Sequence, residues 1–130
     1  MTRFSIIMPV KAVNDFIRET VPHIQRLTGV EWELFIVANE AEKSEWPTDP
    51  RITIISSGRV GPADKRDLGG RIATGEILVF LDDDSYPEPN LLEVGSQYFT
   101  DPDVVAVGGP GITPQSASFW QRVSGAGFLS

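Results

Sequence analysis

The stretch Ile77-Leu78-Val79-Phe80-Leu81-Asp82-Asp83-Asp84 joins the most apolar run of the chain directly to three carboxylates. Five apolar residues are the length of one strand, and a run without polar alternation is typical of a parallel sheet covered on both faces. The sequence therefore predicts a buried strand over residues 77–81, with the three aspartates at its carboxyl end.

Further strands and helices alternate around this run. Helices are predicted to begin near Asn14, Pro62 and Pro87, and the other strands to cover residues 4–10, 32–38, 51–56 and 104–107. This order is typical of an α/β fold: a Rossmann-like, doubly wound, mostly parallel sheet with helices on both faces. Ligands of such sheets bind beyond the carboxyl ends of the strands.

The composition excludes several classes of function. The chain has 130 residues, enough for one domain, and 18 acidic against 11 basic side chains give a net charge of −7, which makes nucleic acid a poor partner. It has no Cys, so thiolate metal sites and Cys nucleophiles are excluded, and its one His disfavours a Ser–His–Asp triad. No apolar run is long enough to span a membrane and no secretory signal is visible, so we expect a cytoplasmic protein.

The three aspartates are the first candidate site. If extended geometry persists beyond the strand, Asp82 and Asp84 point to one side and Asp83 to the other. Paired carboxylates offer the hard oxygen ligands that suit Mg²⁺ or Mn²⁺, which usually keep waters and substrate phosphate oxygens as further ligands. The alternative interpretation is an acidic surface turn.

Three further segments are predicted to reach the same crevice. Lys65, Arg66 and Asp67 lie in the first turns of the helix that starts at Pro62, and a helix N-terminus with basic side chains attracts anions. The loops after the first two strands carry Pro9-Val10-Lys11 and Asn39, whose amide could read a base. A solvated helix face and ordinary turn chemistry are the alternatives.

Taken together, these motifs resemble family 2 glycosyltransferases of the GT-A fold. Residues 5–10 with Asn14 resemble the family's opening strand, residues 61–76 the helix before the metal strand, and residues 77–84 the Asp-x-Asp strand, with Pro89 where the family places a Pro. The resemblance covers nearly all of this chain, but only the nucleotide-binding half of the family's catalytic domain.

The resemblance implies transfer of a sugar from a nucleotide-diphosphate donor to an acceptor, with inversion, assisted by Mn²⁺ or Mg²⁺. Asp84 matches the metal-binding residue of the motif, and Asp82 matches its first aspartate, near the metal, ribose and diphosphate. Asp83 between them is assigned to the nucleotide site. The acceptor stays unidentified.

The resemblance also assigns the other nucleotide-binding residues. The backbone of Pro9, Val10 and Lys11 would line the base pocket, and Lys65 and Arg66 would lie beside the diphosphate. Asn39 stands where the family usually has an Asp that contacts uracil, so a UDP-sugar is favoured but the base stays open. Asp67 stands where the family often has Asn.

The sequence is predicted to divide into a nucleotide-sugar-binding domain, residues 1–115, and an amphipathic segment, residues 116–130, that leads to an acceptor-binding half. We expect the catalytic base beyond Ser130, so this chain should bind donor weakly and not turn over. The apolar side of residues 119–128 could drive formation of a homodimer. Whether membrane helices follow residue 130 is left open.

A second hypothesis is a non-catalytic nucleotide- or partner-binding module with a degenerate site. Asn39 in place of the family's Asp favours it, whereas the intact Asp82 and Asp84 count against it. A phosphoacceptor receiver domain would need acidic residues after the first strand, and residues 8–11 contain none.

Overall fold

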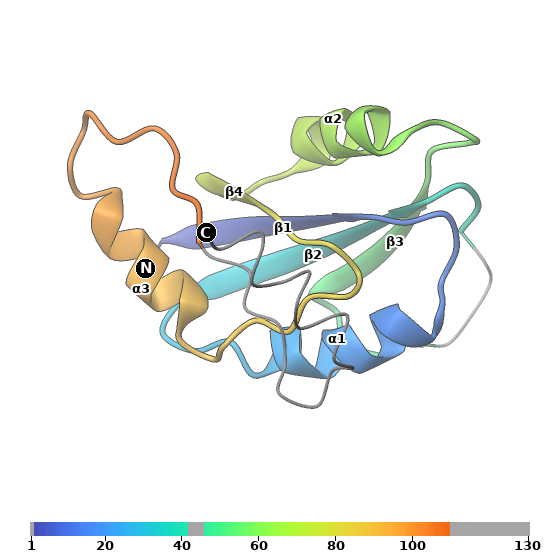
Figure 1. Ribbon diagram of the computed structural model, residues 1–130, viewed down its shortest axis with the longest axis horizontal. Helices are drawn as coiled ribbons and strands as arrows, with labels where there is room; N and C mark the ends of the chain where they lie inside the picture. Colours follow the sequence, from blue (N-terminus) through green and yellow to red (C-terminus); the bar gives the residue numbers. More distant parts are fainter. Residues whose placement is uncertain (1, 42–45, 110–130) are drawn as a thin grey trace, which may run out of the picture. The chain divides into compact units, whose positions relative to one another are not determined.

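The computed structural model describes residues 2–41 and 46–109, which form strands and helices in alternation (Figure 1). The elements, in chain order, are β1 (Arg3–Pro9), α1 (Asp15–Gln25), β2 (Glu31–Ala38), β3 (Ile52–Ser56), α2 (Pro62–Ile72), β4 (Ile77–Phe80) and α3 (Leu91–Tyr98). None of the described helices is both long and apolar enough to cross a membrane.

The four strands form one parallel sheet in the order β3-β2-β1-β4. In its register Ile6 of β1 lies between Leu34 of β2 and Val79 of β4. β1 is apolar on both faces because it is an inner strand, and its residues 4–8 are all buried. The predicted α/β architecture with a parallel sheet is confirmed.

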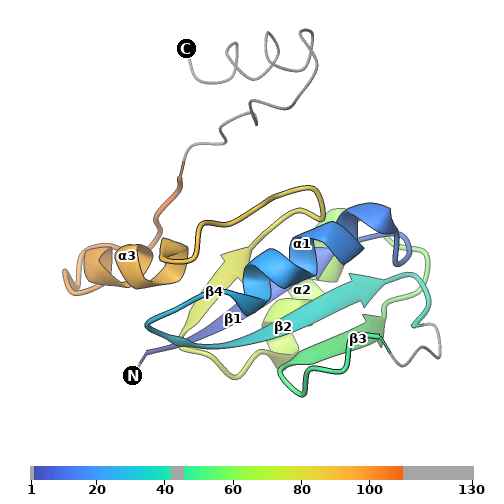
Figure 2. The same ribbon diagram turned by 90° about the horizontal axis from the view of Figure 1, so that it is seen from below.

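Helix α1 covers one face of the sheet (Figure 1, Figure 2). Its start is set by Asn14, whose side-chain Oδ1 accepts a hydrogen bond of 2.9 Å from the backbone N–H of Ile17. Ile17, Val21 and Ile24 then recur at helical spacing and are fully buried against the sheet. The main hydrophobic core lies in this layer.

Helix α2 covers the opposite face (Figure 1), and it packs through Gly69 and Lys65. A Cβ at Gly69 would lie 2.6 Å from Cγ2 of Ile7, so the missing side chain is what allows this approach. The i, i+4 spacing of the apolar Leu68 and Ile72 would favour them as the buried pair of this helix, but Leu68 is only half-buried and Ile72 is 40% exposed. The approach of a glycine to the sheet, rather than apolar spacing, decides which side of the helix faces inward.

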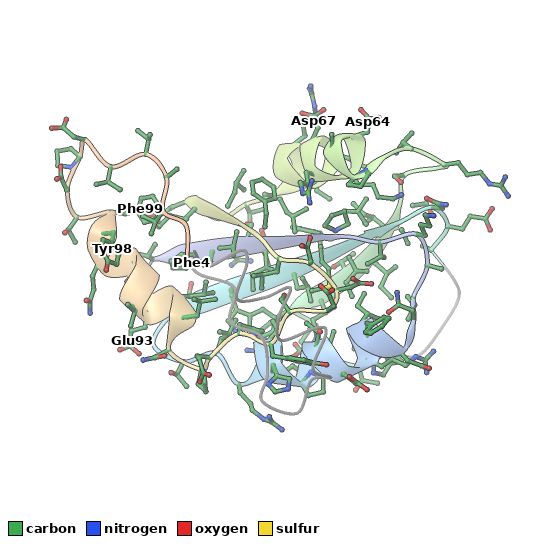
Figure 3. All side chains as sticks on the ribbon, viewed as in Figure 1. Phe4, Asp64, Asp67, Glu93, Tyr98 and Phe99 are labelled. Carbon is green, nitrogen blue, oxygen red and sulfur yellow. The ribbon has the colours of Figure 1, made fainter. Side chains whose placement is uncertain are left out.

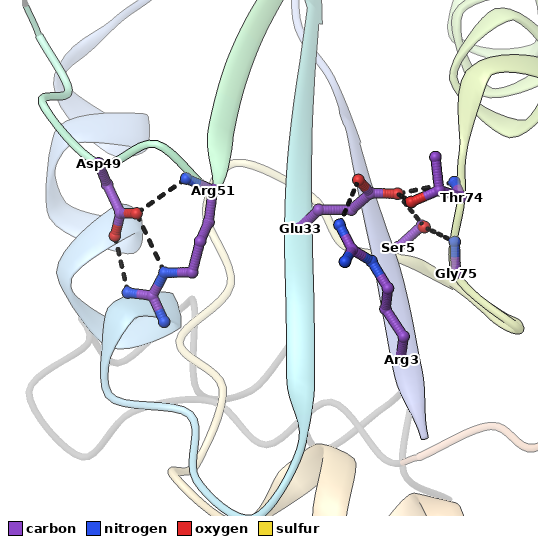
Figure 4. A network of polar contacts seen from close by, with 7 residues as sticks. All are labelled: Arg3, Ser5, Glu33, Asp49, Arg51, Thr74 and Gly75. Atoms are coloured by element: carbon purple, nitrogen blue, oxygen red, sulfur yellow. Dashed lines mark hydrogen bonds and ion pairs between the residues drawn. The ribbon is translucent and has the colours of Figure 1, made fainter. Parts of the chain in front are cut away.

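A polar network fixes the amino edge of the sheet, where the strands begin (Figure 4). The carboxylate of Glu33 in β2 accepts hydrogen bonds from Ser5 Oγ, from the backbone N–H and Oγ1 of Thr74, and from Arg3 Nη2, at 2.6–3.2 Å. Burial alone would raise the pKa of Glu33, but these hydrogen bonds outweigh it and lower the pKa to about 2. The network ties β1 and β2 to the turn that precedes β4.

The predicted strand over residues 104–107 is absent: residues 104–109 form neither helix nor strand. Valine-rich composition favours a strand, but a strand also needs a hydrogen-bonded neighbour, and Val105 is 89% exposed. The residues up to Gln97 form one compact unit, and those from Tyr98 belong to a second. The predicted boundary after residue 115 and the amphipathic segment 116–130 lie outside the described residues.

Candidate functional site

The loops that follow β1 and β2 run side by side at the carboxyl edge of the sheet. Val10 donates its backbone N–H to the carbonyl of Val37 at 2.9 Å, and Asn39 donates its backbone N–H to the carbonyl of Lys11 at 3.0 Å. These two hydrogen bonds extend the β1–β2 pairing past the strand ends. The structure therefore brings Pro9, Val10, Lys11 and Asn39 together as predicted from a parallel sheet.

The start of α2 places a buried ammonium group at this edge. Lys65 is only 3% exposed, and its Nζ donates to Asn39 Oδ1 at 2.6 Å and to the carbonyl of Val60 at 2.9 Å. Because Lys can only donate, the amide oxygen of Asn39 must face it, which leaves the amide N–H groups for other partners. Both acceptors are neutral, and among the described residues no carboxylate forms an ion pair with Lys65.

The chain after β4 places its aspartates next to β1. Leu81 donates its backbone N–H to the carbonyl of Ile7 at 3.2 Å, which continues the β1–β4 pairing by one residue. The chain then turns, because the carbonyl of Asp82 accepts hydrogen bonds from the backbone N–H and the Oγ of Ser85. The extended geometry on which opposite directions for Asp83 and its neighbours depended therefore does not persist through residues 82–84. Asp82 and Asp84 are exposed and Asp83 is half-buried.

The three aspartates have different partners. Asp82 Oδ1 lies 3.6 Å from Arg66 Nη2, an ion pair between largely exposed side chains. Asp83 is held by α1: its carboxylate accepts from Asn14 Nδ2 at 2.8 Å and its carbonyl from Thr20 Oγ1 at 2.7 Å. The sequence identified Asn14 only as a helix cap and gave no signal for Thr20.

Asp84 lies near Tyr86, another residue that sequence reasoning missed. The Tyr86 hydroxyl donates to Glu19 of α1 at 2.8 Å, and its ring packs against His23 with a centroid separation of 4.9 Å. The hydrogen bond to Glu19 raises the pKa of Tyr86, and the charges of Glu19 and Asp84 act in the same direction. Tyr86 thus forms a second tie between this loop and α1.

The donor set at this edge fits a hard divalent cation. Two exposed carboxylates, Asp82 and Asp84, supply oxygen ligands and leave room for waters and phosphate oxygens. Over residues 2–41 and 46–109, no group of three or more His, Asp or Glu side chains is placed to hold a metal ion. A cation here would therefore depend on ligands from a bound substrate.

Asp67 is the one predicted site residue that the structure does not bring to this edge. It lies with Asp64 on the side of α2 that faces away from the sheet (Figure 3). Its carboxylate accepts from Arg71 Nε at 2.9 Å, one turn along the same helix, and both side chains are well exposed. Asp67 is thus a surface partner of Arg71.

A concavity of about 430 Å³ lies near the amino edge and contains none of the predicted site residues. Arg3, Trp32, Glu33 and Arg51 are among its lining. The two guanidinium groups are already committed, Arg3 to Glu33 and Arg51 to Asp49 at 2.7 Å, and Arg51 also covers the Trp32 ring at 3.8 Å. The two cations of the concavity are therefore already paired, and the carboxyl edge remains the candidate site for an anionic ligand.

Comparison with known proteins places these observations in a family. The model of Glycosyl transferase family 2 matches residues 5–129 of the chain. No curated protein sequence matches it in a direct comparison.

Solved structures of similar fold include S. aureus TarS and a mannosyltransferase. S. aureus TarS 1-349 superposes with a TM-score of 0.62 at 18% identity over 85% of this chain, and TarS 1-349 is also known in complex with UDP-GlcNAc. The mannosyltransferase PcManGT from Pyrobaculum calidifontis, in complex with GDP-Man and Mn²⁺, superposes with a TM-score of 0.68 at 25% identity over 79% of this chain. This chain spans 39% of the first structure and 34% of the second.

Proposed function

We propose that this chain, which belongs to Glycosyl transferase family 2 by its match over residues 5–129, binds a nucleotide-diphosphate sugar at the carboxyl edge of its sheet. The proposed reaction is metal-dependent transfer of the sugar to an acceptor, with inversion at the anomeric carbon. The observation that carries the proposal is the approach of Arg66 to Asp82, which brings a helix start with two cations against the exposed carboxylates after β4.

Each side chain of this edge has a proposed part. Asp82 and Asp84 would hold Mn²⁺ or Mg²⁺, and a cation there supplies Lewis-acid stabilisation of the charge on the departing diphosphate. Lys65 and Arg66 would attract the same diphosphate from the start of α2. Asn39 would contact the base.

The comparisons support a nucleotide-sugar donor but leave the base open. One structural neighbour is known with UDP-GlcNAc and another with GDP-Man and Mn²⁺. A UDP-sugar is our first choice, although the amide of Asn39 turns its oxygen toward Lys65 and so has only N–H groups to offer a base. UDP and GDP are therefore both needed in a binding test.

The acceptor hydroxyl must lose its proton as it attacks, which requires a general base. We propose that this base lies outside residues 1–130, so that the chain by itself binds donor without turnover. A second candidate function, a non-catalytic nucleotide-binding module, is favoured by one observation: the Asn39 oxygen is already occupied by Lys65.

The test is thermal melting of the chain with Mn²⁺, UDP and GDP, each alone and in combination. We expect Mn²⁺ and one nucleotide together to raise the melting temperature by several degrees, because a ligand that binds only the folded state stabilises it. Asp84→Asn should abolish the part that depends on Mn²⁺. Asp64→Asn, which removes the same charge on the outer side of α2, should leave it intact (Figure 3).

Three outcomes separate the hypotheses. No shift with any combination of metal and nucleotide would overturn the site assignment. A shift with nucleotide that is the same with and without Mn²⁺ would favour the non-catalytic module. Hydrolysis or transfer of a UDP- or GDP-sugar by the chain alone would disprove the proposed absence of a base.

A further inference from the structure

We propose that Asp83 is a positioning residue: anchored by Asn14 and Thr20 of the α1 region, it fixes the loop that carries Asp82 and Asp84 for binding a divalent cation. The inference rests on the proposed function, because it takes Asp82 and Asp84 as the cation ligands. It gives Asp83 a role different from the direct nucleotide contact that the family resemblance implies.

The first contact of the anchor comes from Asn14, whose side-chain amide forms hydrogen bonds through both its oxygen and its nitrogen. Asn14 Oδ1 accepts from the backbone N–H of Ile17, and this cap fixes which way the amide points. Nδ2 is thereby turned to donate, and it reaches Asp83 Oδ2 at 2.8 Å. The start of α1 and the orientation of the Asp83 carboxylate are thus set by the same residue.

The second contact holds the backbone of the loop. Thr20 is fully buried, and its Oγ1 donates to the carbonyl of Asp83 at 2.7 Å. Asn14 and Thr20 are six residues apart, which is less than two turns along the helix. One contact fixes the side chain of Asp83 and the other its peptide group, which together leave it little freedom to rotate.

This anchor turns the Asp83 carboxylate away from the carboxylates of Asp82 and Asp84. Like charges so close repel each other, and the repulsion falls when one of them turns away and gains hydrogen-bond donors. Asp83 turns toward α1 and is half-buried, whereas Asp82 and Asp84 stay exposed. The outer two carboxylates, Asp82 beside Arg66 and Asp84 beyond it, stay accessible to a cation.

Outer-shell partners that orient metal ligands matter for affinity: their loss typically weakens metal binding about 10- to 100-fold. Tyr86 also links this loop to α1, through an exposed hydrogen bond to Glu19 and a ring contact with His23. Without the Asp83 anchor, the loop would therefore lose more conformational entropy when Asp82 and Asp84 bind a cation, and the affinity would fall.

The experiment is a titration of the chain with Mn²⁺ in the presence of UDP and, separately, of GDP, with free Mn²⁺ followed by electron paramagnetic resonance. Asp83→Asn keeps an acceptor for Asn14, so its Mn²⁺ affinity should fall at most about 3-fold. Asp83→Ala removes the acceptor, and we expect an affinity about 10-fold lower.

Two further variants break the anchor from the other side. Asn14→Ser keeps a helix cap but has no amide to donate to Asp83, so it should also lose about 10-fold in Mn²⁺ affinity while its melting temperature stays close to that of the parent chain. Thr20→Val removes the hydroxyl at constant shape and should weaken Mn²⁺ binding in the same direction.

The outcomes distinguish this inference from the proposed function. If the parent chain binds Mn²⁺ and Asp84→Asn abolishes binding, but Asn14→Ser and Asp83→Ala bind like the parent, the anchor role is disproved and the site stands. If Asp83→Asn loses as much affinity as Asp83→Ala while Asn14→Ser is unaffected, Asp83 is itself a ligand and the inference fails. If the parent chain binds no Mn²⁺ with either nucleotide, the proposed function falls and this inference with it.

Discussion

The two edges of the parallel sheet use polar side chains in opposite ways. At the amino edge the Glu33 carboxylate is buried and accepts four hydrogen bonds from three residues (Figure 4). At the carboxyl edge Asp82 and Asp84 are exposed, and buried Lys65 has only neutral partners among the described residues. Groups at the first edge satisfy one another, whereas groups at the second keep charge and hydrogen-bonding capacity available.

This difference separates stability from binding. A buried carboxylate with all its donors in place stabilises the fold, and removing it leaves those donors unpaired. Exposed carboxylates contribute little to stability, so their presence beside a cationic helix start is better explained by a ligand. The comparison therefore predicts that substitutions at the amino edge change the free energy of unfolding, and those at the carboxyl edge change ligand affinity.

The largest effect is expected for Glu33→Ala, which should lower the free energy of unfolding by about 3 kcal/mol, because it orphans the hydroxyl of Ser5 and the N–H of Thr74. Urea unfolding followed by circular dichroism measures it. Glu31→Ala, an exposed neighbour on the same strand, serves as the control and should stay within about 0.5 kcal/mol. A loss below about 1 kcal/mol for Glu33→Ala would show that the network is not stabilising.

Acid should lower the free energy of unfolding through the same Glu33 network. The pKa of Glu33 is lowered from 4.5 to about 2, so its contribution is fully present above pH 4.5 and is lost as pH falls toward 2. The shift corresponds to about 3 kcal/mol. Urea unfolding between pH 2 and 5 should show a shallower pH dependence for Glu33→Gln than for the parent chain. A residual slope should remain, because the hydrogen bond from Arg51 also lowers the pKa of Asp49.

An intermediate effect is expected where α2 meets the sheet. Gly69→Ala should cost about 2 kcal/mol, because the added Cβ meets the fully buried Ile7. Gly70→Ala is the matched control, since its Cβ would make only an ordinary contact with Leu78 at 3.6 Å, and it should be neutral or stabilising by up to about 1 kcal/mol. Equal melting temperatures for the two variants would contradict the described packing of α2.

Lys65→Met should affect binding more than stability. Replacing a buried ammonium by an apolar side chain of similar length should change the free energy of unfolding by less than about 1 kcal/mol. Affinity for UDP or GDP with Mn²⁺ should fall about 10-fold, because the diphosphate loses a cation. Isothermal titration calorimetry measures it, with the exposed Arg71→Met as the control. A large loss in the free energy of unfolding with unchanged nucleotide affinity would show that Lys65 stabilises the fold and does not bind the diphosphate.

The smallest effect is expected for Asp67→Ala. It removes an exposed pair with Arg71, worth about 0.3–0.5 kcal/mol, and should leave nucleotide and Mn²⁺ affinity unchanged. Asp82→Ala, with the same change in charge, should weaken Mn²⁺ binding in the same titration. Weaker nucleotide binding by Asp67→Ala would restore the role that the family resemblance gives it.

Sequence patterns predicted much of the candidate site because they are local. The strand before the aspartates, the cap at Asn14 and the helix start at Gly61-Pro62 each depend on a few neighbouring residues, and all are present in the structure. The prediction that this strand is buried is wrong, because β4 is at the edge of the described sheet and its Leu78 and Phe80 are exposed. Because the strands are parallel, their carboxyl ends share one edge, so the meeting of Lys11, Asn39 and Lys65 followed from topology.

What the sequence by itself determined is therefore the order of the elements, the parallel sheet and the edge at which its charged groups gather. Only the tertiary structure decided which side of α2 is buried, that residues 104–107 form no strand, and which polar groups are already paired. Asn14 and Asp83 are 69 residues apart and Glu33 and Thr74 are 41 apart, so no local pattern encodes either contact. Such pairings depend on where the elements pack, because a polar group's partner is set by distance in space and not by distance along the chain.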